Sequence, residues 1–304
     1  MLPAVTLVHK AAMPIATHAV RTFARHFSGS YQLRIHTDGS PDAADEAILL
    51  EASGSMPAEI VHPADRAAIL EAKTTAYPLT RQLLTGVAYF TKLQLPVCEA
   101  TPYFYFDSDI VWLRPVTNLA PSRHRNAFST ESWTWYHGIR HDREWIRDRV
   151  PRRVNSGFYH LGDPFPHDRM EDMLARGLFD PTRSYNTDQE IMAYLYRDMD
   201  LYHPEDLKRS RRGVIYDLAT DPSAALHFPG GMWIPHMDRI KALPASRMQP
   251  AIAIRHQEPI PLTRTELLRM RLYLKLAESA AARAPIHLYR KLRHQASSRN
   301  SSST

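Results

Sequence analysis

The chain of 304 residues is 44% hydrophobic and 23% charged, which is typical of a globular protein with one large core or two modest ones and excludes a disordered or fibrous one. The formal net charge is +6. Residues 251–304 hold ten Lys and Arg against three Asp and Glu, whereas residues 1–250 hold 28 against 29, so the excess lies at the C-terminal end. A nucleic-acid-binding protein more often spreads basic residues along its binding face, and we therefore expect no nucleic-acid partner.

The sequence carries no sign of secretion or of a membrane span. No run of 18 apolar residues occurs, and the first 20 residues lack the basic stretch and the cleavage site of a signal peptide. Cys98 is the single cysteine, which excludes an intramolecular disulfide and disfavours a thiolate metal site. We therefore expect a cytoplasmic protein.

Short apolar runs alternate with helical patterns along the first part of the chain. The patterns predict strands at 4–9, 31–40, 59–63 and 103–106, and helices at 14–27, at 42–52 and from 65 to about 95. The strand runs are unbroken, as in a parallel sheet that is covered on both faces. The sequence thus predicts an α/β fold, a single Rossmann-like domain over 1–250 with a mainly parallel central sheet and ligands at the carboxyl ends of its strands.

The chain after residue 250 is expected to form a basic helical extension over 251–293 and a disordered tail over 294–304. A capping box at Thr263 and Glu266 precedes apolar residues at helical spacing, with basic residues among them. Such a helix can lie on an anionic membrane surface, which would place the protein peripherally at the inner face of a membrane. Packing on the body with a solvated basic face is the alternative, and both interpretations stay open.

Two aspartates follow the apolar strand "YFYF" at Asp107 and Asp109. Residues two apart in an extended chain point the same way, so both carboxylates can address one ion. Oxygen ligands in such a pair suit Mn²⁺ or Mg²⁺ and, through the metal, a diphosphate. Turn chemistry alone also explains an Asp-x-Asp after a strand.

"FDSDIV" also looks like the nucleophile motif of the haloacid-dehalogenase phosphatases, and "GDPFPHD" at 162–168 loosely matches their later acidic motif. In that family the first motif follows the first core strand, whereas several strand and helix units precede it here. This alternative would make Asp107 a covalent nucleophile.

Three later stretches add polar residues at positions typical of a binding site. Asn155 and Gly157 open an apolar run, and Gly157 would allow close backbone approach. Asp188 and Gln189 fall in the first turn of a helix that begins with a Thr-x-x-Glu capping box. His227 ends a short apolar run before "FPGG". A turn, a dipole-matched acid and a partly buried histidine are the ordinary explanations.

The order of these motifs, together with the helix "AYFTKLQLP" (88–96), resembles the nucleotide-sugar glycosyltransferases of the A-type fold over roughly residues 4 to 240. The resemblance is closest to the retaining family that includes glycogenin and the lipopolysaccharide galactosyltransferases. It implies a UDP-sugar donor, bound Mn²⁺ (or Mg²⁺) and a carbohydrate or lipid-linked sugar acceptor.

The resemblance also implies roles for single residues. The metal ligands would be Asp107, Asp109 and His227, while Lys92, Ser108 and the approach at Gly157 would serve the donor, and Asn155, Asp188 and Gln189 would surround its sugar. Retention would place Gln189 near the anomeric carbon; inversion would instead need Asp188 or Glu190 as a base. Strand ends at the same sheet edge make His9 and Asp38 candidates for base or ribose contacts, although a surface turn explains Asp38 equally well.

One departure from the resembled pattern concerns the leaving group. Trp233 stands near the place of a lysine that steadies the diphosphate in that family, and Arg211 and Arg212 are candidates to replace it. The departure leaves a third hypothesis open, a catalytically inactive nucleotide-binding scaffold. The acceptor is expected near 129–145, where three aromatic side chains could stack on sugar rings or belong to the core, namely Trp133, Trp135 and Tyr136.

Overall fold

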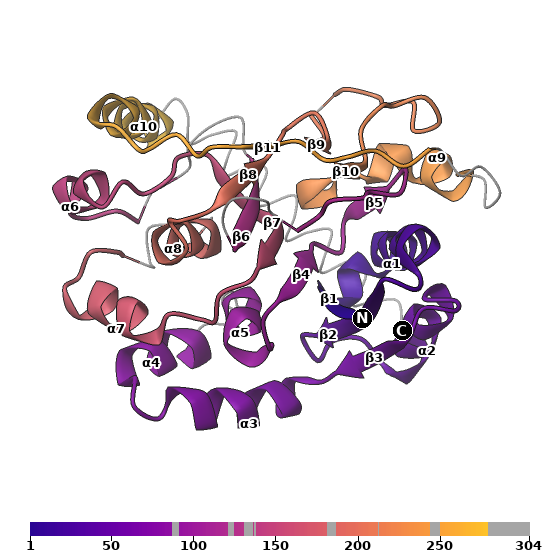
Figure 1. The fold of residues 1–304 in the computed structure, drawn as a ribbon, viewed down its shortest axis with the longest axis horizontal. Helices are drawn as coiled ribbons and strands as arrows, with labels where there is room; N and C mark the ends of the chain where they lie inside the picture. The colour runs from indigo at the N-terminus through magenta and orange to yellow at the C-terminus, as the bar shows by residue number, and fades with distance from the viewer. Residues whose placement is uncertain are drawn as a thin grey trace.

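The computed structural model describes residues 1–86, 91–120, 125–130, 136, 138–180, 187–211, 213–243 and 250–278, with side chains for all of these except 187 and 273–278. Their strands form two sheets (Figure 1). The larger sheet has eight strands in the order β11-β8-β6-β7-β4-β1-β2-β3, and the smaller has three in the order β5-β10-β9.

The predicted elements of the first 61 residues are all present. They are β1 (Leu2–Val8), α1 (Met13–Phe27), β2 (Tyr31–Thr37), α2 (Ala43–Ala52) and β3 (Ala58–Val61). The region expected to be helical from 65 to about 95 is helical in the structure, divided into three helices. They are α3 (Pro63–Thr74), α4 (Pro78–Gly86) and α5 (Thr91–Cys98), and α3 and α4 are separate because Pro78 cannot continue a helix and fits at the start of a new one. Residues 87–90, in and beside the expected motif helix, lie outside the described residues.

The large sheet is parallel in its first half and mixed in its second. β1 pairs in parallel with β2 and with β4 (Tyr103–Phe106), and β2 with β3. β7 (Val154–Leu161) runs antiparallel to both β4 and β6 (Asn126–Thr130), while β6 is parallel to β8 (Asp200–Tyr202). The start of β7 therefore lies at the same edge as the carboxyl ends of β1, β2 and β4.

The small sheet lies against this edge and brings in a late part of the chain. β5 (Ile110–Trp112) pairs antiparallel with β10 (Ala225–His227), which pairs in parallel with β9 (Leu207–Arg209). The other helical elements are α6 (Asp142–Arg147), α7 (His167–Ala175), α8 (Thr187–Leu195), α9 (Met237–Lys241) and the 3₁₀ turns η1 (Lys10–Ala12), η3 (Pro229–Gly231) and η4 (Ile234–His236).

The aromatic strand β4 is central and buried, as predicted. All four of its side chains are at most 1% exposed. Phe106 stacks on Phe23 of α1 with ring centroids 4.6 Å apart, whereas Tyr105 stacks on Tyr159 of β7 at 4.7 Å. On the face that carries Tyr105, Nζ of Lys92 from α5 lies 5.0 Å from the centroid of the Tyr105 ring. Side chains of helices therefore lie on both faces of the strand, which explains its unbroken apolar sequence.

The chain after residue 250 packs on this body. β11 (His256–Gln257) pairs with β8, and α10 (Arg264–Glu278) begins where the Glu266 backbone N–H is capped by the Thr263 hydroxyl at 3.2 Å. Leu267 and Met270 are 1% and 3% exposed, so the apolar face of α10 lies on the core, as the packing alternative expects. The expected tail at 294–304 lies outside the described residues, and none of the helices in the described ranges has the length and apolarity to cross a membrane.

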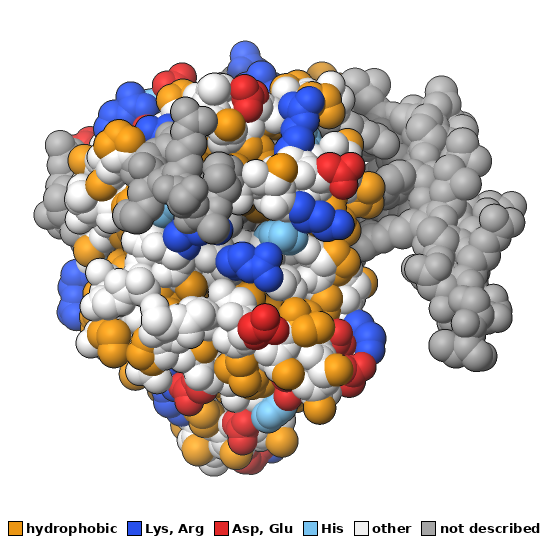
Figure 2. Space-filling model, turned by 90° about the vertical axis from the view of Figure 1, so that its right-hand side faces the viewer, with side chains coloured by type: hydrophobic (Ala, Val, Ile, Leu, Met, Phe, Trp, Pro, Cys, Tyr) orange, Lys and Arg blue, Asp and Glu red, His pale blue; other side chains and the backbone are white. Residues whose placement is uncertain are grey.

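Basic side chains also gather on the body itself. Figure 2 shows Lys, Arg and His side chains in the middle and upper part of the face on the side of α1, α2 and α9. Burial lowers the pKa of His18 on α1, and the charges of Arg21 on α1 and Lys241 on α9 lower it further. Positive charge is thus locally concentrated outside the C-terminal segment as well.

Candidate active site

A tight turn joins the two sheets at Asp107 and Asp109. The N–H of Ile110 donates to the carbonyl of Asp107 at 3.1 Å, so the extended conformation expected for this pair is wrong. The turn keeps the two carboxylates close together, and the pairing of Ile110 with His227 across β5 and β10 brings the imidazole to them. One ligand atom each of Asp107, Asp109 and His227 lies within 4.8 Å of the others.

The chemistry of this cluster fits a divalent cation. Nε2 of His227 lies 3.2 Å from Oδ1 of Asp109 and 3.5 Å from Oδ2 of Asp107. Oδ1 of Asp109 is buried, and among the described residues it accepts no hydrogen bond of acceptable geometry. If His227 is neutral and offers Nε2 to a metal, this oxygen has no donor, and a buried carboxylate oxygen without a donor is costly unless a cation meets it. Two carboxylates with one imidazole suit Mn²⁺ or Mg²⁺.

The electrostatics of the cluster agree with mutual attraction. Burial opposes the charged form of both partners, yet the charge of His227 lowers the pKa of Asp109, and Asp109 and Asp107 raise the pKa of His227. Attraction between the opposite charges therefore outweighs their burial.

Gly157 makes room for the cluster. A Cβ at this position would lie 2.5 Å from Cε1 of His227, 2.7 Å from Oδ1 of Asn155 and 2.9 Å from Oδ2 of Asp107. The backbone N–H of Asp107 also donates to the Gly157 carbonyl at 2.7 Å. The sequence suggested that this glycine allows a ligand to approach; the structure shows that it first allows the three side chains to approach one another.

Lys92 of α5 joins the cluster to α8. Its Nζ donates to Oδ1 of Asp107 at 2.7 Å and lies 3.5 Å from Oδ2 of Asp188. Burial works to lower the pKa of Lys92, but the two carboxylates outweigh it and raise that pKa. Tyr105, which the sequence reasoning missed, donates its hydroxyl to the same oxygen of Asp107 at 2.6 Å. Its place two residues before Asp107 on one strand face was the available signal.

Side chains from the start of β7 and from the first turn of α8 lie next to Lys92 and the cluster. The Ser156 hydroxyl, also missed, donates to Oδ2 of Asp188 and holds that carboxylate beside Lys92. Oδ1 of Asn155 accepts from the Gly157 N–H at 2.8 Å and from the Ser129 hydroxyl at 3.0 Å. The carbonyl oxygen of the Asn155 amide, a side chain expected to surround the donor sugar, is therefore already engaged within the protein.

The remaining predicted residues divide into those near the cluster and those set apart. Ser108 is 9% exposed within the turn, and Gln189 is half-buried next to Asp188. Glu190 is fully buried, and its Oε2 accepts from the Gly138 N–H at 2.8 Å. That position makes Glu190 part of the core rather than the exposed base that inversion would need.

His9 and Asp38 follow the ends of β1 and β2, at the expected sheet edge. Both are exposed, and Oδ1 of Asp38 accepts from the backbone N–H of Ser40 at 2.9 Å. This is the turn geometry weighed as the alternative for Asp38. Among the residues that the structure describes, neither His9 nor Asp38 forms a hydrogen bond or an ion pair with Asp107, Asp109 or His227.

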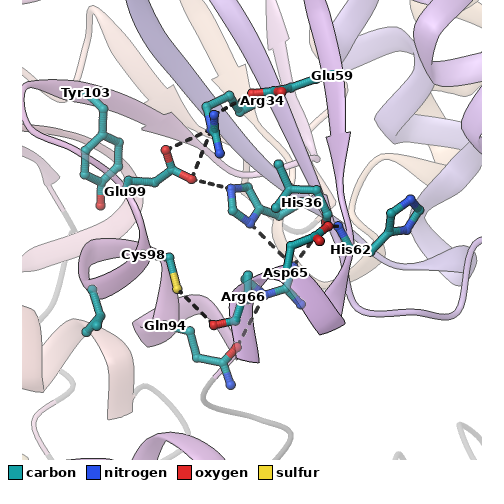
Figure 3. Close-up of polar contacts among 12 residues, drawn as sticks. Arg34, His36, Glu59, His62, Asp65, Arg66, Gln94, Cys98, Glu99 and Tyr103 are labelled. Carbon is teal, nitrogen blue, oxygen red and sulfur yellow. Dashed lines mark hydrogen bonds and ion pairs between the residues drawn. The ribbon is translucent and has the colours of Figure 1, made fainter. Parts of the chain in front are cut away.

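A buried polar network supports this edge from behind (Figure 3). Arg66 of α3 is 2% exposed and donates to the carbonyl of Thr37, the last residue of β2, at 2.6 Å, and to Oε1 of Gln94 on α5 at 3.3 Å. His36 Nε2 lies 2.6 Å from Oε1 of Glu99. The network thus connects the strand end before Asp38 with the helix that carries Lys92.

Only some of the residues predicted to serve the acceptor or the leaving group lie in the described part of the chain. Tyr136 is 1% exposed and donates its hydroxyl to the Pro151 carbonyl at 2.6 Å, so it belongs to the core. Trp133, Trp135 and Arg212 lie outside the described residues. Arg211 is exposed just beyond β9, and Trp233 is half-buried against a hydrophobic cluster that includes Leu226 and Phe228.

The two-sheet α/β architecture is the A-type glycosyltransferase fold, as comparison with solved structures shows. The apo structure of the bifunctional glycosyltransferase WbbM matches at 12% identity with a TM-score of 0.55, over 79% of this chain and 49% of that one. This chain thus spans about half the length of WbbM. An active-site mutant of LgtC matches at 12% identity, a TM-score of 0.49, and 80% and 95% coverage. No protein-family model and no curated protein matches the sequence.

Proposed function

We propose that this protein is a metal-dependent glycosyltransferase that moves a sugar from a UDP-sugar to a carbohydrate or lipid-linked acceptor with retention. The observation that carries the proposal is the convergence of Asp107, Asp109 and His227 beside Lys92 and Asp188, at the strand edge where such a fold binds ligands.

The charges of the site support a divalent ion. Three carboxylates, of Asp107, Asp109 and Asp188, lie with one ammonium, of Lys92, and one imidazole, of His227. With His227 neutral, as a metal ligand must be, the side chains sum to −2, and one divalent cation balances them. When bound, the ion would neutralise negative charge that develops on the departing diphosphate.

The protein's own groups position the donor around that point. Lys92 fixes the Asp107 and Asp188 carboxylates relative to each other, and Ser156 holds Asp188 from the other side. Asp188 then presents its second oxygen to a sugar hydroxyl, and Gln189 follows it in the same helical turn. Groups held in this way cost little reorganisation during the reaction.

Retention is favoured because neither candidate base is available. Glu190 is buried and bonded to the Gly138 backbone. One oxygen of Asp188 is held by Ser156 and Lys92, and the other is given to a hydroxyl of the donor sugar, so neither oxygen is left for the acceptor. An inverting enzyme needs a carboxylate that can take the acceptor proton.

The phosphatase alternative is disfavoured by the direction of β7. Leu161 pairs with Tyr103, the first residue of β4, so the acidic stretch at 162–168 follows at the amino end of β4. Asp107 lies at the carboxyl end of that strand. The two motifs are thus at opposite sheet edges and cannot share one phosphate.

Calorimetric titration of UDP with and without Mn²⁺ tests the proposal, with Asp109→Asn as the variant and Asp163→Asn, at the opposite edge, as its matched control. Binding should need both the metal and Asp109 and be unchanged in the control. Metal-independent binding that Asp109→Asn leaves intact would overturn the proposal. Release of UDP from a panel of UDP-sugars then separates an enzyme from an inactive scaffold.

A further inference from the structure

A stripe of basic side chains runs along one side of α1. His18, Arg21 and Arg25 follow one another at spacings of three and four residues, so they point to the same side of the helix. α9 packs beside α1 and adds the exposed Lys241 at its end. No carboxylate in the described part of the chain forms an ion pair with Arg21 or Lys241. These charges are therefore open to a partner outside the protein.

Exposed apolar side chains border the basic stripe. Ile234 lies in η4, directly before α9, and is 65% exposed. Val214 and Ile215 lie in the segment after β9 and are 42% and 53% exposed. Figure 2 shows hydrophobic side chains among the basic ones on this side of the molecule. Apolar side chains that gather beside one another at a surface often mark a site of interaction.

The segment after β9 is held against η4 and α9. The ring of Tyr216 lies 5.7 Å from the ring of His236, and Nη1 of Arg239 donates to the Tyr216 carbonyl at 3.0 Å. Tyr216 also shares a buried hydrophobic cluster with Ile15 of α1 and Ile240 of α9. The basic side chains of α1 and α9 and the apolar side chains at 214, 215 and 234 thus form one surface, which we call the α1–α9 face.

The α1–α9 face carries an excess of positive charge. α1, α9 and residues 214–217 hold four Lys and Arg against two Asp, which are the exposed Asp217 and Asp238. One of these two carboxylates, that of Asp217, is already bonded to the Ala219 N–H at 3.1 Å and to the Thr220 hydroxyl at 2.9 Å. The face is therefore complementary to a negatively charged partner.

We propose that the α1–α9 face binds the surface of an anionic lipid bilayer. Peripheral membrane binding combines basic groups, which attract anionic headgroups, with apolar side chains, which enter the boundary between headgroups and acyl chains. The face offers both kinds of group side by side. A soluble polyanion would meet the charges only and would leave Val214, Ile215 and Ile234 in water.

The face adjoins the candidate active site. Phe228, which follows His227, donates its backbone N–H to the carbonyl of Asp109 at 3.0 Å, and η3, η4 and α9 follow it in the chain. Docking through the face would hold the site close to the bilayer. The inference goes beyond the proposed function and does not rest on it, because lipid binding needs neither metal nor nucleotide.

The outer side of α10 is the rival surface. Leu268 and Leu272 are 66% and 60% exposed there, one helical turn apart. One of the basic groups beside them, that of Arg271, forms an ion pair with Asp142 of α6. The two surfaces have different side chains and can be tested separately.

The test is co-sedimentation of the full chain with lipid vesicles, without Mn²⁺ or nucleotide. We expect binding to vesicles that contain phosphatidylglycerol and at least about tenfold weaker binding to vesicles of phosphatidylcholine alone, since about 1 kcal/mol per basic residue comes from the anionic surface. High salt should weaken the binding because it screens these charges.

Two double variants probe the face. Arg21→Gln with Lys241→Gln should weaken binding to the anionic vesicles by about 30-fold, which is about fivefold for each basic residue. Ile215→Ser with Ile234→Ser should weaken it by about tenfold or more, because less apolar surface enters the bilayer. The matched control pairs are exposed residues elsewhere and should bind like the unaltered protein: Arg143→Gln with Arg149→Gln, and Leu268→Ser with Leu272→Ser.

Four results would overturn the inference. They are equal binding to neutral and anionic vesicles, equal losses in the Arg143 and Arg149 control, loss in the α10 pair while both variants of the face bind normally, and binding to soluble polyphosphate but to no vesicle. All substituted side chains are exposed, so each variant should keep the Tm of the unaltered protein, and a loss of binding then does not reflect misfolding. UDP binding is measured separately, so failure here leaves the proposed function standing.

Discussion

The ammonium of Lys92 lies 2.7 Å from one carboxylate oxygen of Asp107 and 3.5 Å from one of Asp188. It therefore connects the turn that carries the candidate metal ligands with the helix that would meet the donor sugar. Replacing Lys92 with Gln removes the only positive charge in this trio and lets the two carboxylates repel each other.

We expect Lys92→Gln to lower kcat/KM by about 100-fold, a loss of roughly 2.7 kcal/mol in transition-state stabilisation. Lys92→Arg keeps the charge and should recover most of it. The measurement is UDP release under saturating Mn²⁺. Equal losses in both variants would show that shape, not charge, matters at this position.

Gly157→Ala should weaken Mn²⁺ binding by about tenfold or more, because the added Cβ would lie within 2.9 Å of side-chain atoms of Asp107, Asn155 and His227 and displaced supports typically cost this much. Gly86→Ala is the control, since a Cβ there meets no atom within 4 Å. Direct Mn²⁺ titration measures the effect. Unchanged affinity in Gly157→Ala would mean that Asp107 and His227 are not metal ligands.

Acid should destabilise the protein through His36 and Glu99. An arginine can only donate, so Nδ1 of His36 accepts from Arg66 at 3.4 Å and a neutral His36 donates from Nε2 to Glu99. Burial lowers the pKa of His36; for Glu99 burial works in the opposite direction, but His36 and Arg34 outweigh it and lower that pKa too.

Because the pKa values of His36 and Glu99 are both lowered in the folded protein, both groups make the protein less stable as the pH falls. Stability from His36 is complete above its unfolded pKa of about 6.5 and that from Glu99 above about 4.3, and each is lost as pH falls towards the folded value. Urea unfolding should show a falling free energy of unfolding from pH 7 to pH 4. Glu99→Gln should cost about 2 kcal/mol at pH 7 and less at pH 4, while Glu59→Gln, at the exposed end of the network, should change little. A constant Glu99→Gln deficit across this range would contradict the assignment.

Glu190→Gln should keep kcat within about tenfold, since an amide oxygen can still accept from the Gly138 N–H. Loss of a general base costs about 100- to 10,000-fold. Turnover of the variant, together with the anomeric configuration of the product by NMR, decides between retention and inversion. A loss above 100-fold in a folded variant, with an inverted product, would return Glu190 to the role of base.

Much of the first half of the fold follows from the sequence, since unbroken apolar runs and helical periodicity are local properties. The region after residue 65 was predicted to be helical, but periodicity did not show that α3 ends before Pro78 and that a new helix begins there. The strand end at Asp107 was also predictable. Its conformation was not, because a turn and an extended pair share the same Asp-x-Asp pattern.

The sequence by itself determined which residue types were available: carboxylates after a buried strand, a glycine at the start of another, an acid in a first helical turn and a histidine before a glycine turn. Only the tertiary structure decided which of them meet. The antiparallel direction of β7 brings Asn155 and Gly157 to the edge where β4 ends, and the small sheet sets His227 between Ile110 and Arg209. Strand direction and pairing depend on contacts far apart in the chain, so no local pattern could place His227 beside Asp109 or set Glu190 in the core.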